Sequence, residues 1–266
     1  LVEEKDATAE QRAIRTVNGG AYVLPWAPLK QALARLSNAN AQGEYYLTDA
    51  VVAVGKETPV TLEIVDPQEL GGMNSRLDQA NLQALAQTQI NETWMRGGVT
   101  FLAPSTTFVG PRVTLHQDVT LEPNVRLEGS VTVGANTLIG QGSIVRHSRL
   151  DAGVVVRPYS LLESAVVGAE AVVGPFSRLR EGTILDSGAH VGNFVETKKA
   201  HLHARVKANH LTYLGDCEIG EDTNIGAGVI TCNYDGVRKH RTLIGRRVFV
   251  GSDTQLVAPV SVGDDA

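Results

Sequence analysis

Residues 109–145 read VGPRVTLHQDVTLEPNVRLEGSVTVGANTLIGQGSIV and carry an aliphatic side chain at every sixth position. The α-helical period is 3.6 residues, and the alternation of a strand alone would not single out every sixth residue. Short flat strands joined by tight turns explain the spacing. The seven positions of this unbroken register are Val109, Leu115, Leu121, Leu127, Val133, Ile139 and Val145.

The same period continues along most of the remaining chain, interrupted by two steps of five residues. A second group of positions is Leu150, Val156 and Leu162, followed by Val167, Val173, Leu179, Leu185 and Val191. The register returns at Tyr213, Ile219 and Ile225, and then at Ile244, Val250, Leu256 and Val262. The sequence therefore predicts that all of these side chains point into one continuous core.

A solenoid with the outline of a triangular prism accounts for the pattern. Each hexad would form one side of the prism, so that three hexads, or about 18 residues, complete one coil. Gly, Asn and Asp recur beside the aliphatic positions and tolerate the backbone of the corners. Aromatic residues make up only 5% of the chain, which agrees with a narrow interior.

Two stretches interrupt the register, one between Thr197 and Tyr213 and the other between Thr231 and Ile244. A solenoid can expel inserted residues as loops without disturbing its stack, and such loops often carry function. We therefore expect chemistry at His210 in the first stretch and at Asn233, Tyr234 and Lys239 in the second.

Composition excludes several classes of function. The net charge of −5 and the lack of a long basic run argue against a nucleic-acid partner. The two cysteines, Cys217 and Cys232, cannot form a disulfide framework and fit a reducing compartment. No run of 18 or more apolar residues predicts a membrane span, and no secretion signal is recognised, so we expect a cytoplasmic protein.

The first 76 residues lack the six-residue period and predict a mixed α/β structure. Residues 2–4, 20–24 and 61–65 have the composition of short strands, and 61–65 also alternates. Leu29, Leu33 and Leu36 share a helical face after 25–28, and a further helix is expected to begin near Thr48.

A connecting helix is predicted over 76–95, ended by Gly97 and Gly98. Its apolar stripe consists of Leu82, Leu85, Ala86, Ile90 and Trp94. The pair Gly19 and Gly20 precedes a strand-like stretch and does not open a helix, so it is interpreted as a turn. No phosphate-binding loop is recognised.

Motifs in the second half are more specific than the repeat itself. They comprise GNFVE at 192–196, the Lys198–Lys199 pair, HLTYLGD at 210–216, NIGAG at 224–228 and TCNYDG at 231–236. EEKDAT at 3–8, NAQGEYYLTD at 40–49 and MNSR at 73–76 add to them. In this order they resemble the bacterial family of bifunctional N-acetylglucosamine-1-phosphate uridyltransferase/glucosamine-1-phosphate acetyltransferases.

The resemblance implies a left-handed parallel β-helix of hexapeptide repeats, preceded by a partial α/β nucleotidyltransferase domain and a linking helix. The expected boundaries are 1–76 for the end of the uridyltransferase domain, 77–98 for the linker helix and 99–266 for the acetyltransferase domain.

It also implies a homotrimer whose acetyltransferase sites lie between neighbouring β-helices. In such an enzyme, acetyl passes from acetyl-CoA to the amine of glucosamine 1-phosphate. A second reaction with UTP then gives UDP-N-acetylglucosamine for cell-envelope synthesis.

Site residues are carried over from the family by motif position. His210 matches the general base, a role suited to imidazole because it titrates near neutral pH. Positions expected to bind glucosamine 1-phosphate are Arg180, Lys198, Tyr213, Asn224, Asn233, Tyr234 and Lys239. Positions expected near acetyl-CoA are Ala227, Asn233, Tyr234 and Ser252. In the front half, Glu3, Asn18 and Asn74 match residues that bind UTP or UDP-N-acetylglucosamine, and Asn74 would contribute an oxygen ligand to Mg²⁺.

We expect the chain to be cut at both ends relative to this family. It should then lack uridyltransferase activity and be weak or inactive as an acetyltransferase. Two alternatives remain open. The first is a zinc-dependent β-helix carbonic anhydrase that uses His201, His203 and His210. The second is a non-catalytic β-helix that serves only in assembly.

Overall fold

The computed structural model describes residues 1–266, except for the side chains at positions 67 and 68. The chain divides into two compact units, Leu1–Leu82 and Gln83–Ala266. Helix α4 (Arg76–Arg96) begins in the first unit and continues into the second. Each unit is described by itself.

The first unit is built from short helices. They are η1 (Glu4–Asp6), α1 (Ala9–Arg12), α2 (Trp26–Ala34), α3 (Leu47–Glu57) and η2 (Pro67–Leu70). Helices α2 and α3 confirm the two helices predicted from the leucine pattern and from Thr48. They enclose a small core of Ala32, Ala50 and Val54.

The three strands expected in the first unit are not formed. Residues 2–3, 20–24 and 61–66 have irregular backbone, and residue 4 begins η1. A strand needs a neighbouring strand to satisfy its backbone groups. In the described part of this unit no strand is present to provide that pairing, and alternating residues such as Leu62 and Ile64 are exposed.

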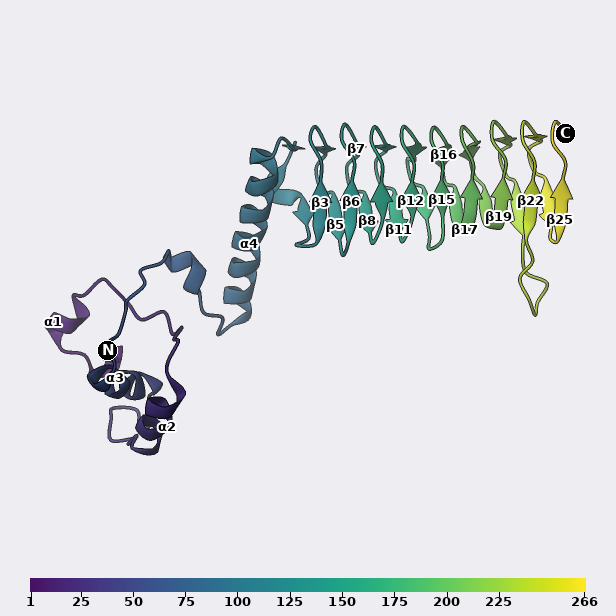
Figure 1. The fold of residues 1–266 in the computed structure, drawn as a ribbon. Coiled ribbons are helices and arrows are strands. Elements are labelled where there is room, and N and C mark those ends of the chain that lie inside the picture. Colours follow the sequence, from purple (N-terminus) through teal and green to yellow (C-terminus); the bar gives the residue numbers. More distant parts are fainter. The chain divides into compact units, whose positions relative to one another are not determined.

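The second unit is a parallel β-solenoid in which every paired strand runs parallel to its neighbours (Figure 1). One face is a nine-stranded sheet. Its strands in order are β1 (Thr100–Phe101), β4 (Thr120–Leu121), β7 (Leu138–Ile139), β10 (Val155–Val156), β13 (Val172–Val173), β16 (His190–Asn193), β18 (Lys207–His210), β20 (Asn224–Ile225) and β23 (Phe249–Val250).

The remaining strands belong to one sixteen-stranded sheet that bends over two faces. The first of these faces holds β2 (Phe108–Val109), β5 (Arg126–Glu128), β8 (Ile144–Arg146), β11 (Leu161–Glu163), β14 (Arg178–Leu179), β21 (Ile230–Cys232) and β24 (Gln255–Val257). The other holds β3 (Val113–Leu115), β6 (Val131–Val133), β9 (Arg149–Leu150), β12 (Val166–Val167), β15 (Ile184–Leu185), β22 (Thr242–Ile244) and β25 (Val260–Val262).

Two long strands, β17 (Glu196–Leu202) and β19 (Tyr213–Ile219), join these two faces. The start of β17 pairs with β14, and its end pairs with β15. Three faces per coil confirm the prism predicted from the sequence. Phe108, Arg126 and Ile144 occupy the same position in three successive coils, which gives the expected spacing of eighteen residues.

The aliphatic ladder fills the interior almost as predicted. Residues such as Leu121, Leu162 and Val191 are fully buried, and one continuous core runs from Val99 to Leu256. Two predicted positions are only half-buried. One is Val262, in the last strand, and the other is Tyr213, whose neighbour Leu214 is fully buried. The predicted register was therefore wrong by one residue at this point.

The first predicted interruption is not a loop. Residues 197–213 include most of β17 and all of β18, and the coil closes normally around Thr197, Leu202 and Ala208, which are all fully buried. The hydroxyls of Thr183 and Thr197 lie 3.0 Å apart inside the core. The hexad pattern was missed because Thr and Ala stand where large aliphatic residues were sought.

The second predicted interruption is confirmed. A loop between β21 and β22 projects from the stack of coils (Figure 1). Tyr234 and Lys239 form an antiparallel bridge across it.

Helix α4 is fixed to the first coil by amide side chains as well as by its apolar stripe. Ile90 and Trp94 pack against the solenoid core. Asn91 is buried and donates hydrogen bonds to the carbonyl oxygens of Pro104 (2.9 Å) and Thr107 (3.0 Å). Gly98, with φ of 91°, ends the turn that leads into the solenoid, as predicted. A short 3-10 helix, η3 (Pro104–Thr106), follows β1.

Candidate functional site

Two cationic side chains expected to bind phosphate lie together on one face of the solenoid. Arg180 follows β14, and Lys198 belongs to β17, which pairs with β14. Both are paired with carboxylates: Arg180 donates to Glu196 at 2.7 Å, and Lys198 lies 3.0 Å from Glu181. Glu181 is also 3.9 Å from Arg180, so the four residues form one network, which we term the cationic cluster.

Hydrogen bonds within the cationic cluster favour the ionised forms of Arg180 and Glu181. The hydrogen bond from Arg180 to Glu196 is the main cause that raises the pKa of the guanidinium. Lys198 is the main cause that lowers the pKa of the Glu181 carboxyl group. The two positive charges are therefore balanced by two negative ones, and an incoming anion would have to compete with these carboxylates.

Tyr213 lies on the next coil beside this cluster. It is in register with Glu196, and Gly215 is in register with Lys198. A Cβ atom at position 215 would collide with the Tyr213 hydroxyl, so the phenol ring extends across Gly215. Glycine is needed at position 215 for this close approach. The Tyr213 hydroxyl group therefore lies over Gly215, the residue that pairs with Lys198 on the preceding coil.

The projecting loop is joined to the same face through Asp216. Its carboxylate accepts a hydrogen bond from the Asn233 side-chain amide at 2.6 Å and lies 3.9 Å from the Lys239 ammonium. Asn233 is buried, whereas Tyr234 is exposed. Thus Asn233 and Lys239 approach the strand that carries Tyr213.

Asp235 stabilises the loop internally and was not singled out from the sequence. Its carboxylate accepts hydrogen bonds from the backbone N–H groups of Val237 (2.8 Å) and Arg238 (2.6 Å) and lies 2.7 Å from the His240 ring. These contacts lower the pKa of Asp235 to about 2, and the hydrogen bond from the Arg238 backbone has the largest effect. An Asp followed by Gly inside a conspicuous insertion was the signal that could have identified this turn.

His210 belongs to a different part of the solenoid surface. It is the exposed last residue of β18, in register with Asn193 of β16 on the nine-stranded sheet. The pKa of His190 is lowered mainly by burial, then by the charges of Arg157 and Lys207, and last by His210. Asn224 belongs to this sheet as well, in register with Lys207.

Across the described side chains, no hydrogen bond or ion pair connects His210 with the cationic cluster or with Asn233. The expected location of His210 in an expelled loop was wrong, because residues 207–210 are a strand. His210 thus ends a strand of the nine-stranded sheet, whereas Lys198 and Tyr213 belong to the sixteen-stranded sheet.

Ala227 and Ser252 lie at one corner of adjacent coils. The backbone N–H of Asp253 donates to the carbonyl oxygen of Ala227 at 2.8 Å, and a Cβ at Gly226 would meet the backbone of Ser252. These two residues, predicted near acetyl-CoA, are neighbours at a corner that follows β20 and β23.

The three residues of the predicted nucleotide site in the first unit have separate surroundings. Glu3 accepts a hydrogen bond from Thr48 at 3.1 Å, and Asn18 donates one to Tyr22 at 2.5 Å. The backbone N–H of Asn74 donates to Asp78 at 3.1 Å. Where side chains are described, no hydrogen bond joins Glu3, Asn18 and Asn74 to one another.

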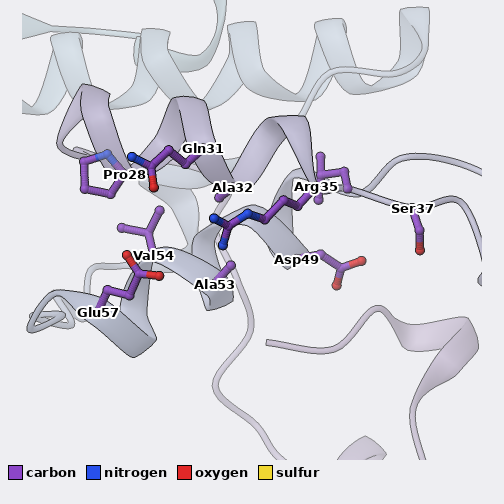
Figure 2. Close-up of a pocket in the computed structure, with 10 residues that line it drawn as sticks. Pro28, Gln31, Ala32, Arg35, Ser37, Asp49, Ala53, Val54 and Glu57 are labelled. Atoms are coloured by element: carbon purple, nitrogen blue, oxygen red, sulfur yellow. The ribbon is translucent and has the colours of Figure 1, made fainter.

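A pocket in the first unit lies between α2 and α3 (Figure 2). Arg35 extends toward it, with Asp49 and Glu57 on the facing helix. None of the residues predicted to bind nucleotide lines it. The pocket therefore supports no assignment made from the sequence.

Two of the three histidines of the carbonic anhydrase alternative lie together within one chain. His201 and His203 lie close together, with ring centroids 4.0 Å apart. Among the described side chains they share Asp186, and His210 is not a member of the group. A site with three histidines is therefore not formed within one chain.

One family model matches part of the solenoid. The family of GMPPB C-terminal domains matches residues 109–209. The fold thus defines a hexapeptide-repeat β-helix protein.

Curated relatives align with the whole chain. "Bifunctional protein GlmU" of Acinetobacter baylyi is 45% identical over 269 residues, and its counterparts in Janthinobacterium sp. and Aromatoleum aromaticum are each 46% identical. Each alignment covers 100% of this chain and 59% of the relative, so the chain spans somewhat over half of the length of these curated proteins. Over its whole length the chain is similar to these GlmU proteins.

Solved structures are more distant. LpxA from Acinetobacter baumannii has a TM-score of 0.43 at 15% identity, covering 59% of this chain and 67% of that one. The UDP-N-acetylglucosamine acyltransferase of Campylobacter jejuni also has a TM-score of 0.43 at 15% identity, covering 56% of this chain and 65% of that one.

Among the described helices, none is both long enough and apolar enough to cross a bilayer.

Proposed function

We propose that the second unit carries the acetyltransferase centre of a GlmU-type enzyme, which transfers acetyl from acetyl-CoA to the amine of glucosamine 1-phosphate. The observation that carries this proposal is the cationic cluster, with Arg180 and Lys198 side by side at the family's motif positions. A phosphate monoester needs such cations, and the guanidinium of Arg180 can form two parallel hydrogen bonds to it.

The proposed reaction is a direct acyl transfer. The sugar amine attacks the thioester carbonyl carbon, a C–N bond forms, the C–S bond breaks and CoA leaves as its thiolate. His210 takes the proton of the amine, which imidazole can do near neutral pH. Tyr213, Asn224, Asn233, Tyr234 and Lys239 are proposed to hold the sugar phosphate. Ala227 and Ser252, with Asn233 and Tyr234, would lie along acetyl-CoA.

We propose that the active site is shared between chains, because His210 and the cationic cluster belong to different sheets and no described hydrogen bond or ion pair joins them. We assign the protein to a homotrimer in which His210 of one left-handed β-helix faces the cationic cluster of its neighbour. A ring of identical subunits joined head to tail allows two different faces to meet in this way. The non-catalytic alternative gives no reason for paired cations to coincide with the motif positions.

The proposed role of the first unit is to form part of a uridyltransferase domain. In the longer protein this domain would couple N-acetylglucosamine 1-phosphate to UTP in the cytoplasm. The domain limits at 76 and 98 are kept as part of this proposal. Glu3, Asn18 and Asn74 would then be a partial nucleotide site, and we expect no UTP-dependent release of pyrophosphate from this chain alone. A clear turnover in that assay would contradict the expectation.

Mg²⁺ is not accommodated by the residues that surround Asn74. This ion prefers six oxygen ligands in octahedral geometry. The carboxylate of Asp78, which is the nearby acidic group, already accepts hydrogen bonds from the backbone of Asn74 and from Ser75. We derive no reaction step through Mg²⁺ in this chain.

The acetyltransferase proposal is tested by measuring CoA release with glucosamine 1-phosphate in the full-length gene product. His210→Ala should lower kcat by about 10²–10⁴-fold, the usual contribution of a general base. His116→Ala, at an exposed position on another coil, is the matched control and should leave the rate unchanged. Equal rates for both variants would remove His210 from the reaction.

A further inference from the structure

A group of polar residues on another face of the solenoid has no part in the proposed reaction. It comprises Asp186, His201 and His203, whose potential ligand atoms all lie within 4.8 Å of one another. Asp186 directly follows β15, His201 is on β17, and His203 directly follows β17. We propose that these three side chains form a binding site for one divalent transition-metal ion of the zinc type.

The fold itself brings the three side chains together. Leu202 points into the core, so His201 and His203 both project outward from the same side of the strand. The backbone N–H of Asp186 donates to the carbonyl oxygen of Leu202 at 2.8 Å, which places the carboxylate on the adjacent coil between the two rings. The arrangement is thus determined by a rigid β-ladder.

The distances suit a tetrahedral ion. Nε2 of His201 lies 3.1 Å from Oδ1 of Asp186, and Nδ1 of His203 lies 3.0 Å from Oδ2. Zinc binds nitrogen and oxygen at about 2.0–2.2 Å, so neighbouring ligand atoms in a tetrahedron are about 3.3 Å apart. Small rotations of the side chains would therefore place all three around one ion.

A fourth residue orients one of the ligands. Nε2 of His203 lies 3.1 Å from Oε1 of Glu218 on β19, and the other oxygen of Glu218 accepts a hydrogen bond from Arg241 at 2.7 Å. A carboxylate that receives the outer N–H of a histidine fixes the tautomer in which the inner nitrogen can bind metal. Glu218 is therefore a positioning residue, and Arg241 holds Glu218 in place.

The surroundings leave room for the ion and for a further ligand. The side chains of Asp186, His201 and His203 are each about one-third exposed. A groove beside them is lined by Glu218, Leu243 and Val262, among others. Three protein ligands with an open fourth position are typical of zinc sites that retain water. Two imidazoles favour zinc, cobalt or nickel over Mg²⁺ or Ca²⁺, which prefer oxygen.

The site is independent of the proposed acetyltransferase centre. Its ligands come from two adjacent coils, so the bound ion would link β15 to β17. Because the ion binds only the folded solenoid, it should also raise the melting temperature of the second unit.

The test is a titration of tag-free, chelator-stripped protein with Zn²⁺ in competition with a chromophoric chelator. One ion should bind per chain, and an excess of Mg²⁺ should not displace it. His201→Ala and His203→Ala should each weaken binding by more than the 10–100-fold that loss of an orienting residue costs. Glu218→Gln should retain one ion per chain with affinity lower by about 10–100-fold. His116→Ala is the matched control and should bind as the wild type does.

Co²⁺ provides a second measurement, because its visible absorption distinguishes four-coordinate from six-coordinate ions. Asp186→Asn, which preserves the shape of the side chain, should change this spectrum while the circular dichroism stays the same. Wild-type binding no tighter than that of His201→Ala would overturn the proposal. The same is true if His116→Ala weakens binding as much as His203→Ala does.

Discussion

Replacing Leu202 by alanine tests whether residues 197–213 are part of the packed solenoid. Leu202 is fully buried on β17, in register with Leu185 on one side and Ile219 on the other. The substitution removes three carbon atoms from the core, worth about 2.4 kcal/mol at about 0.8 kcal/mol for each buried CH₂. The cavity left by a rigid ladder adds to this, and we expect a total loss of about 3–5 kcal/mol.

The assay is chemical and thermal unfolding of the second unit, followed by circular dichroism. A loss of about 3 kcal/mol corresponds to a fall in Tm of about 6–12 °C for a unit of this size. Leu211→Ala is the matched control, since Leu211 is in the same stretch but 64% exposed. It should change the free energy of unfolding by less than about 0.5 kcal/mol. Equal stability of the two variants would show that this stretch does not pack as a coil.

Three further predictions concern other parts of the chain. Cys217 is buried, and burial raises the pKa of its thiol to about 12. An alkylating reagent should therefore modify only Cys232 in the native protein and both cysteines in the denatured protein, and mass spectrometry counts the adducts. The pKa of the Asp235 carboxyl group is lowered to about 2. Its stabilisation of the loop is therefore complete above the unfolded pKa of about 4 and is lost as the pH falls through about 2. A carbon NMR titration of this carboxyl group with a midpoint near 4 would contradict the prediction. Asn91→Ala removes the two hydrogen bonds that a buried amide donates to backbone carbonyl groups, and it should destabilise the second unit by about 1–3 kcal/mol. Thr88→Ala, on the exposed side of α4, should cost less than about 0.5 kcal/mol, and urea unfolding measures both variants.

The solenoid could be predicted from sequence because its core is one-dimensional. Each aliphatic side chain packs on its equivalents in neighbouring coils, so the spacing of the residues directly encodes the fold. The prediction of inward positions failed where residues other than large aliphatic ones occupy them. Thr197 and Ala208 fill inward positions without being large and aliphatic, and Tyr213 mimics an inward residue while Leu214 occupies the core.

The first unit was less predictable because its stretches depend on partners distant in sequence. Residues 61–65 alternate as a strand would, yet whether they form one depends on the presence of a neighbouring strand. The two helices were predictable because their stabilising pattern is local, as in the leucine face of α2.

The sequence predicts a set of candidate site residues but not their geometry. Motif positions identified Arg180, Lys198 and the loop that carries Asn233. The pairing of each cation with a carboxylate depends on the register between coils, which single motifs do not encode. His210 belongs to a different sheet because β18 pairs with β16 and β20 in the nine-stranded sheet.

The most direct test of the central claim is to mix two inactive variants of the full-length gene product. His210→Ala and Arg180→Ala each disable one of the two groups, and subunits are exchanged by mild denaturation and refolding of an equal mixture. If the active site combines His210 of one chain with Arg180 of its neighbour, about one-quarter of the interfaces in a closed ring of randomly mixed chains contain both intact residues. The mixture should then recover about one-quarter of the wild-type rate of CoA release. A mixture as inactive as its two components would contradict a site shared between chains.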